Sequence, residues 1–159
     1  MTARPAPLAL LSMSVLAAWL GAAVFVAAVV TPAAFAVLPT RALAGAVVGR
    51  ALPVLFTLGL LVGAAVAVMN HSVRAGRSVT FSATTLSLAS ASALLVTIRL
   101  RAMTAAIGRP MDALDPADPR RVAFGRMHGL SVLLMGIGLL AACVALVAIA
   151  RHLNSRSSA

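Results

Sequence analysis

Four long apolar runs, separated by short polar stretches, constrain this chain more than any other feature of its sequence. Hydrophobic residues make up 62% of its 159 residues, charged residues make up only 10%, and the mean hydropathy is +1.06. A helix of about 20 apolar residues is long enough to cross the hydrocarbon core of a bilayer. The composition therefore excludes an ordinary soluble domain. It predicts an integral, multi-pass membrane protein, in the cell membrane if the source is prokaryotic.

The apolar runs predict where the chain crosses the bilayer. The expected spans are residues 8–30, 53–70, 79–98 and 130–150. The first should end at Thr31-Pro32, because the residue before a proline is pushed out of the helical region. We expect a polar loop over Ala102–Ala117 and a short polar tail over residues 152–159.

Two of the expected helices are longer than a bilayer is thick. One runs over Arg41–Asn70, with Thr40 as its N-cap and a kink possible at Pro53. The other begins at Asp118-Pro119, an N-cap followed by a proline at the first helical position, and runs through Arg151. The sequence therefore predicts an all-α integral membrane four-helix bundle. Its second and fourth helices exceed the hydrocarbon core of about 30 Å and project on one side.

The charge is strongly positive, at +10, and every basic residue is an arginine. The arginines flank the apolar runs, which is typical of headgroup anchors and does not favour nucleic-acid binding. We call the side that holds residues 31–52 and 99–129 the loop side, and the opposite side the terminal side. The loop side carries more arginines, so the positive-inside rule places it in the cytoplasm.

Nothing in the sequence indicates a catalytic, metal or cofactor site. The three histidines are split between the two sides: His128 lies on the loop side, and His71 and His152 lie on the terminal side. His71 and His128 would be about 30 Å apart and could not share a metal or haem. There is no His-Glu-x-x-His motif, no phosphate-binding glycine loop and no Glu. Cys143 is a lone cysteine, so we expect no disulfide within the chain.

The three acidic residues lie together before the last apolar run, at Asp112, Asp115 and Asp118. We expect Asp112 and Asp115 to form exposed ion pairs with Arg120 and Arg121. Exposed ion pairs of this kind contribute little to stability.

One stripe of residues at the start of the fourth helix could form a polar site. Arg121, Gly125 and His128 are spaced four and three residues apart, so they share a helix face, and Ser131 follows one turn later. This arrangement suggests a site at the membrane mouth for an anionic ligand, a lipid headgroup or a proton. The alternative is that His128 is only a helix-end residue bonded to a neighbouring loop. The candidate polar site comprises His128, Ser131, Arg121, Arg126 and Arg50.

Small residues four positions apart permit close helix approach. They occur at Gly45 and Gly49, at Gly59 and Gly63, and at Gly125 and Gly129. We expect them to pack within the chain, with homo- or hetero-oligomerisation through the same faces as the alternative. Trp19 lies near the middle of the first span, so its indole N–H should face the bundle and find a polar partner. The many Ser and Thr residues of the third span should bond their own backbone or a neighbouring helix.

Several segments of the sequence also resemble segments of a known family, the transmembrane protein 205-like domain proteins. Its first half is similar to Trp19-Leu20-Gly21, to Val29-Val30-Thr31-Pro32-Ala33-Ala34-Phe35, and to Leu43-Ala44-Gly45 with Gly49 and Pro53. The stretch Phe124-Gly125-Arg126-Met127-His128-Gly129-Leu130-Ser131 resembles the opening of its last helix, with Met127 in place of a leucine. The resemblance covers roughly residues 8–150. It implies a four-helix membrane protein of unassigned reaction.

Three functions remain open from the sequence. The first is a binding, transport or transport-accessory role centred on the loop side, in contact with the lipid bilayer and an anionic ligand or headgroup. The second is a membrane-bound haem or metal redox protein or enzyme, similar to small copper-resistance-type membrane domains in the Trp-Gly feature of its first helix. The third is a structural helix-bundle partner of another membrane protein.

Overall fold

The computed structural model describes residues 5–157 and shows only helices within them. The helices are α1 (Pro5–Phe25), the π-helix η1 (Val26–Val30), α2 (Thr31–Val37), α3 (Arg41–Val73), α4 (Arg77–Ile107), the short 3-10 helix η2 (Met111–Ala113) and α5 (Pro119–Ser157). The predicted all-α fold is therefore confirmed.

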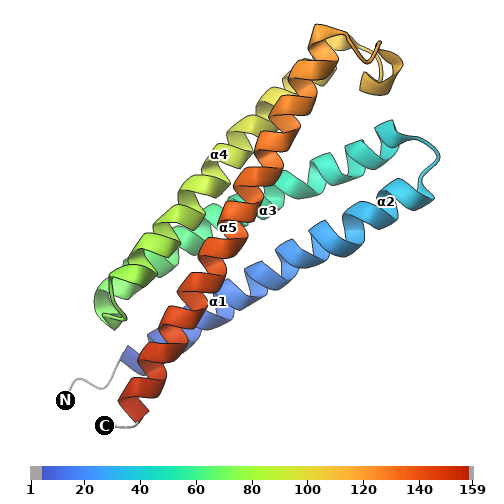
Figure 1. The fold of residues 1–159 in the computed structure, drawn as a ribbon. Coiled ribbons are helices and arrows are strands. Elements are labelled where there is room, and N and C mark those ends of the chain that lie inside the picture. Colours follow the sequence, from blue (N-terminus) through green and yellow to red (C-terminus); the bar gives the residue numbers. More distant parts are fainter. Residues whose placement is uncertain (1–4, 158–159) are drawn as a thin grey trace.

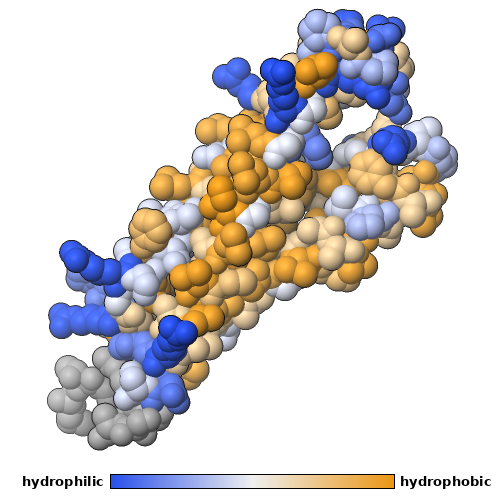
Figure 2. Space-filling model, in the orientation of Figure 1, coloured by the Kyte–Doolittle hydropathy of each residue, from blue (hydrophilic) through white to orange (hydrophobic). Residues whose placement is uncertain are grey.

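Four helical segments are long and apolar enough to cross a membrane: Pro7–Val37, Arg41–Val73, Arg77–Ile107 and Pro119–Ser155. Figure 2 shows an apolar middle zone with hydrophilic side chains gathered at both ends of the molecule. At about 1.5 Å per residue, the 33 residues of α3 and the 39 of α5 exceed a hydrocarbon core of about 30 Å. The long second and fourth helices are confirmed, and α4, with 31 residues, exceeds the core as well.

The first helical segment does not end at Thr31-Pro32, which corrects the sequence prediction. The chain continues from α1 through η1 into α2 and ends at Val37. The backbone N–H of Thr31 donates to the carbonyl oxygen of Val26, five residues earlier, and the Thr31 hydroxyl donates to the same oxygen at 2.8 Å. Proline has no N–H to donate to a helix. The wider π-turn accommodates the hydrogen bond that Pro32 cannot donate, so the helix does not end there.

The polar loop and tail are also shorter than predicted. The loop expected over Ala102–Ala117 begins at Gly108, because α4 continues to Ile107. Gly108 has a φ of 66°, the left-handed conformation in which glycine commonly ends a helix. The tail expected at residues 152–159 is helical through Ser157, because α5 does not end at Arg151.

Both predicted N-caps are present. The Thr40 hydroxyl accepts the backbone N–H of Leu43 at 3.2 Å. The Asp118 carboxylate accepts the backbone N–H of Arg120 at 2.8 Å. Each cap supplies a partner for one of the N–H groups that a helix leaves free at its start.

The helices pack lengthwise, as Figure 1 shows: α4 lies against α3 and α5, and α1 also contacts α3 and α5. The start of α1, the end of α5 and the turn between α3 and α4 lie at one end of the molecule. The connections from α2 to α3 and from α4 to α5 lie at the other end. There α2 and the first part of α3 lean away from α4 and α5, so the loop side is forked.

The closest helix contacts involve two glycines of α3. A Cβ on Gly59 would lie 2.9 Å from the Trp19 ring and 2.5 Å from the Ser90 hydroxyl. A Cβ on Gly63 would lie 2.6 Å from the backbone oxygen of Ala83 in α4. This pair therefore packs within the chain, as expected. A Cβ on the other predicted glycines would meet no atom within 4 Å, namely at Gly45, Gly49, Gly125 and Gly129.

The hydroxyl groups of α4 mostly bond their own helix, as predicted. Thr84, Thr85 and Thr97 each donate to the carbonyl oxygen four residues earlier, at 2.8–2.9 Å. Ser87 also reaches α3, where its hydroxyl lies 3.2 Å from the Leu60 carbonyl oxygen. These bonds pair the hydroxyls within α4 and, at Ser87, join α4 to α3.

Candidate functional site

The predicted polar site begins where the loop meets α5. The guanidinium of Arg121 donates to the carbonyl oxygen of Leu114 at 2.7 Å. Leu114 is buried, with 3% of its surface exposed, so the loop folds back onto the first turn of α5. Arg121 is thereby held by the loop.

His128 lies two turns further along α5 and is exposed. Its ring is parallel to that of Phe124, one turn earlier, with the ring centroids 6.4 Å apart. Ser131, one turn beyond His128, is buried, with 5% of its surface exposed. At 3.6 residues per turn, Arg121, His128 and Ser131 share one face of α5, which runs from the loop toward the interior.

The other two residues of the predicted site do not join this face. Arg126 and His128 are two residues apart, which places them on nearly opposite sides of the helix. Arg50 is exposed on α3, in the other arm of the fork. Among the residues that the structure describes, no hydrogen bond or ion pair links any two of the five.

The ion pairs differ from the prediction. The observed pair joins Asp118 to Arg120 at 2.7 Å, and neither Asp112 nor Asp115 takes part in it. The Asp115 carboxylate instead accepts the backbone N–H of Ala117 at 2.7 Å, which closes a turn. The side-chain and backbone hydrogen bonds from Arg120 lower the pKa of Asp118 from 3.8 to about 2. Asp118 therefore stays charged and caps the start of α5.

A contact that the sequence interpretation missed joins α4 to the loop-side half of α3. Pro53 lies inside α3 and has no N–H, so the carbonyl oxygen of Gly49 loses its usual partner four residues later. The guanidinium of Arg101 donates to that oxygen. A proline inside an expected helix, followed by an arginine at the end of the next span, was the signal that could have indicated this contact.

A second missed residue, Asn70, fixes the turn between α3 and α4. It is buried, and its amide donates to the Gly76 carbonyl oxygen at 3.0 Å and to the Thr80 hydroxyl at 2.8 Å. Its side-chain oxygen accepts the Ala75 N–H at 3.1 Å. A buried side-chain amide must find hydrogen-bond partners. The isolated Asn70 at the end of an apolar run was therefore the signal in the sequence that could have indicated this role. Its role is structural.

The histidines lie as the sequence interpretation expected, with His128 on the loop side and His71 and His152 on helix ends at the terminal side. Within the part of the chain that the structure describes, no three His, Cys, Asp or Glu side chains gather as a metal ion would need. Cys143 is exposed on α5.

Comparison with known proteins identifies a family that the chain matches. A protein-family model described as "Domain of unknown function (DUF4149)" matches residues 14–116, well over half of the chain. The matched region includes Trp19, Pro32 and Pro53 but ends before α5 and His128. No curated protein and no solved structure matches the chain.

Proposed function

We propose that this protein, which belongs to the family described as a domain of unknown function (DUF4149), binds an anionic amphiphile at the loop side of a membrane-spanning four-helix bundle. The role would be binding, transport or assistance to a transporter, with the loop side in the cytoplasm. We also propose kinship with the transmembrane protein 205-like proteins. Support for that kinship comes from residues 19–21, 29–35 and 124–131.

The observation that carries the proposal is the uneven charge of the loop side. This side holds three aspartates, and one of them, Asp118, is already paired with Arg120. The positive charge that remains lies beside apolar helix faces, and such a surface attracts anionic headgroups. The loop side holds eight arginines against its three aspartates: Arg41, Arg50, Arg99, Arg101, Arg109, Arg120, Arg121 and Arg126.

The hydrocarbon part of such a ligand would lie against small-residue faces of α3 and α5. A Cβ on Gly45 or Gly49 of α3, or on Gly125 or Gly129 of α5, would meet no atom within 4 Å. His128 lies exposed between Gly125 and Gly129 in sequence, close to the loop. Its ring nitrogens can hydrogen-bond a carboxylate or phosphate oxygen.

The test is thermal unfolding of the full chain in a neutral detergent, with oleate as the probe and oleyl alcohol as its uncharged counterpart. A ligand that binds the folded state raises the unfolding temperature. We expect oleate, but not oleyl alcohol, to raise the unfolding temperature. We expect His128→Ala to reduce the rise that oleate causes. His71→Ala is the matched control, since His71 is exposed on the terminal side. Equal stabilisation by both amphiphiles, or an unchanged oleate effect in His128→Ala, would contradict the proposal.

The open glycine faces also favour a second candidate, an oligomer with a copy of itself or with another membrane protein. Gly125 and Gly129 are one turn apart on α5 and could allow a partner helix to approach closely. Gly129→Leu should then abolish a dimer, or a stoichiometric co-purifying partner, seen after mild detergent extraction. Gly21→Leu is the control, since Gly21 is also open but lies on α1.

A further inference from the structure

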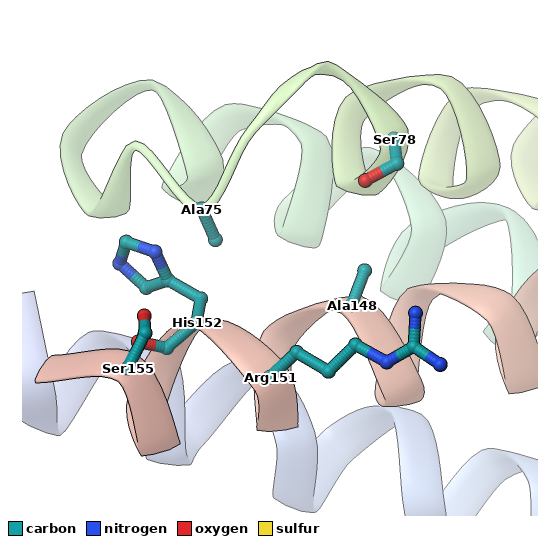
Figure 3. Close-up of a pocket in the computed structure, with 6 residues that line it drawn as sticks. All are labelled: Ala75, Ser78, Ala148, Arg151, His152 and Ser155. Atoms are coloured by element: carbon teal, nitrogen blue, oxygen red, sulfur yellow. The ribbon is translucent and has the colours of Figure 1, made fainter. Parts of the chain in front are cut away.

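A hollow at the terminal side lies between the start of α4 and the end of α5, at the opposite end of the molecule from the loop side. Figure 3 shows its lining, which comes from the α3–α4 turn, the first turn of α4 and the last turns of α5. It measures about 420 Å³ and is open to the outside. The lining residues are Ala75, Ser78, Ala148, Arg151, His152 and Ser155.

The charge around this hollow is entirely positive among the described residues. Arg151 lines it, and Arg74 and Arg77 lie in and just after the adjoining turn. All the acidic residues of the chain lie at positions 112–118, on the other side. An anion at the hollow would therefore meet cations and no competing carboxylate side chain.

The start of α4 adds donors to the same place. Its N-cap, Gly76, makes no side-chain capping bond, so the N–H groups of the first turn are left for another partner. Ser78 lies in that first turn and lines the hollow. Helix N-termini with free N–H groups favour phosphate oxygens.

One ring nitrogen of His152, a partly buried residue of the hollow's wall, has no hydrogen-bond partner among the described residues. This atom, Nε2, is itself buried. A buried polar atom without a partner lowers stability. The imidazole also lines the hollow, beside Ala75.

An apolar groove continues from the hollow along α5. It shares Ser78, Ala148 and Arg151 with the hollow. Cys143, Val144 and Val147 extend it toward the middle of α5. From Arg151 to Cys143 the helix runs about 12 Å, long enough to lie along part of an acyl chain.

We infer that the hollow and its groove bind one anionic phospholipid. The phosphate would lie beside Arg151, Ser78 and the first turn of α4, with an acyl chain along Val144 and Val147. The apolar groove is the reason to assign a lipid here and not free phosphate. This site is independent of the function proposed for the loop side, because the two share no residue.

The test is native mass spectrometry of the delipidated full chain in a neutral detergent. In a His128→Ala background, which weakens the proposed loop-side site, phosphatidylglycerol should form a one-to-one adduct more readily than phosphatidylcholine at equal concentration. Arg151→Gln should weaken the phosphatidylglycerol adduct by about tenfold, as loss of a hydrogen bond to a charged group does. Arg126→Gln is the matched control: it removes the same charge from the same helix, but at the loop side, away from the hollow.

A second variant tests the groove separately. Val144 is 53% exposed, so Val144→Trp should leave the fold intact, which circular dichroism can check, while filling the groove. Val144→Trp should reduce the phosphatidylglycerol adduct. This variant therefore tests the site even if Arg151→Gln does not fold. The assignment is overturned by equal losses in Arg126→Gln and Arg151→Gln, by equal adducts with both lipids, or by an unchanged adduct in Val144→Trp. Displacement of the lipid by inorganic phosphate alone would also overturn it, in favour of a free-phosphate site.

Discussion

Trp19 of α1 donates its indole N–H to the backbone carbonyl oxygen of Leu55 in α3, at 3.0 Å. The Trp19 ring lies directly over Gly59, one turn further along α3. It also approaches α5, since a Cβ on Gly138 would lie 3.7 Å from the ring. One buried side chain therefore contacts two other long helices, and it fits only because Gly59 has no side chain.

Gly59→Ala should lower the free energy of unfolding by about 1–3 kcal/mol, the usual effect of overpacking a tight core. The added Cβ would meet both the Trp19 ring and the Ser90 hydroxyl at less than 3 Å. Thermal unfolding in detergent measures the change. Gly136→Ala is the control, because a Cβ there meets no atom within 4 Å. It should be neutral or stabilise by up to about 1 kcal/mol. Equal losses in both variants would show that Gly59 is not a packing position.

The sequence predicted the kind of partner that Trp19 finds but not its identity. A polar group at the middle of a span must be satisfied inside the protein, so an inward partner could be expected. Which carbonyl oxygen it meets depends on how α1 and α3 align, and no local pattern encodes that alignment. Both N-caps were predictable because each depends on a few neighbouring residues.

The predictions that failed relied on local rules that packing or backbone geometry overrode. Proline at position 32 normally ends a helix, but the π-turn at Val26–Val30 carries the helix past it. Arg126 lies two residues from His128 and so on nearly the opposite face of α5. The hollow beside His152 could not be predicted, because it forms only where the start of α4 meets the end of α5.

The Asp118 cap should make stability depend on pH at the acidic end. Its pKa is about 2 in the folded chain against an ordinary 3.8. A lowered pKa in the folded state means that the stabilisation is fully present above about pH 4. It is lost as the pH falls toward 2. Unfolding temperatures between pH 2 and pH 5 should therefore fall more steeply for the native chain than for Asp118→Asn, which keeps a capping oxygen without the charge. Identical slopes would contradict the role of the charge.

Labelling with a membrane-impermeant maleimide tests the topology. In a Cys143→Ser background, cysteines at Ser72 and Ser155 should react from one side of the membrane, and a cysteine at Ala113 from the other. The reason is that the end of α3 and the end of α5 lie together, while the α4–α5 loop lies at the far end. All three positions are exposed. Reaction of Ser72→Cys and Ser155→Cys from opposite sides would exclude four crossings.

The contact between Arg101 and Gly49 should depend on Pro53, and a double-mutant cycle can measure that dependence. In the native chain Arg101→Met leaves the Gly49 carbonyl oxygen without a donor, so it should lower stability by about 1 kcal/mol. Pro53→Ala restores the N–H that this oxygen would otherwise accept.

In that background Arg101→Met should therefore have almost no effect. Arg99→Met, which removes a charge from the same part of α4 but no described bond to α3, should stay within about 0.5 kcal/mol in both backgrounds. Equal effects of Arg101→Met with and without Pro53 would mean that the guanidinium acts by its charge alone. If Arg101→Met lowers stability in the native chain but not in the Pro53→Ala background, then Arg101 supplies the hydrogen bond that Pro53, without an N–H, cannot donate to Gly49.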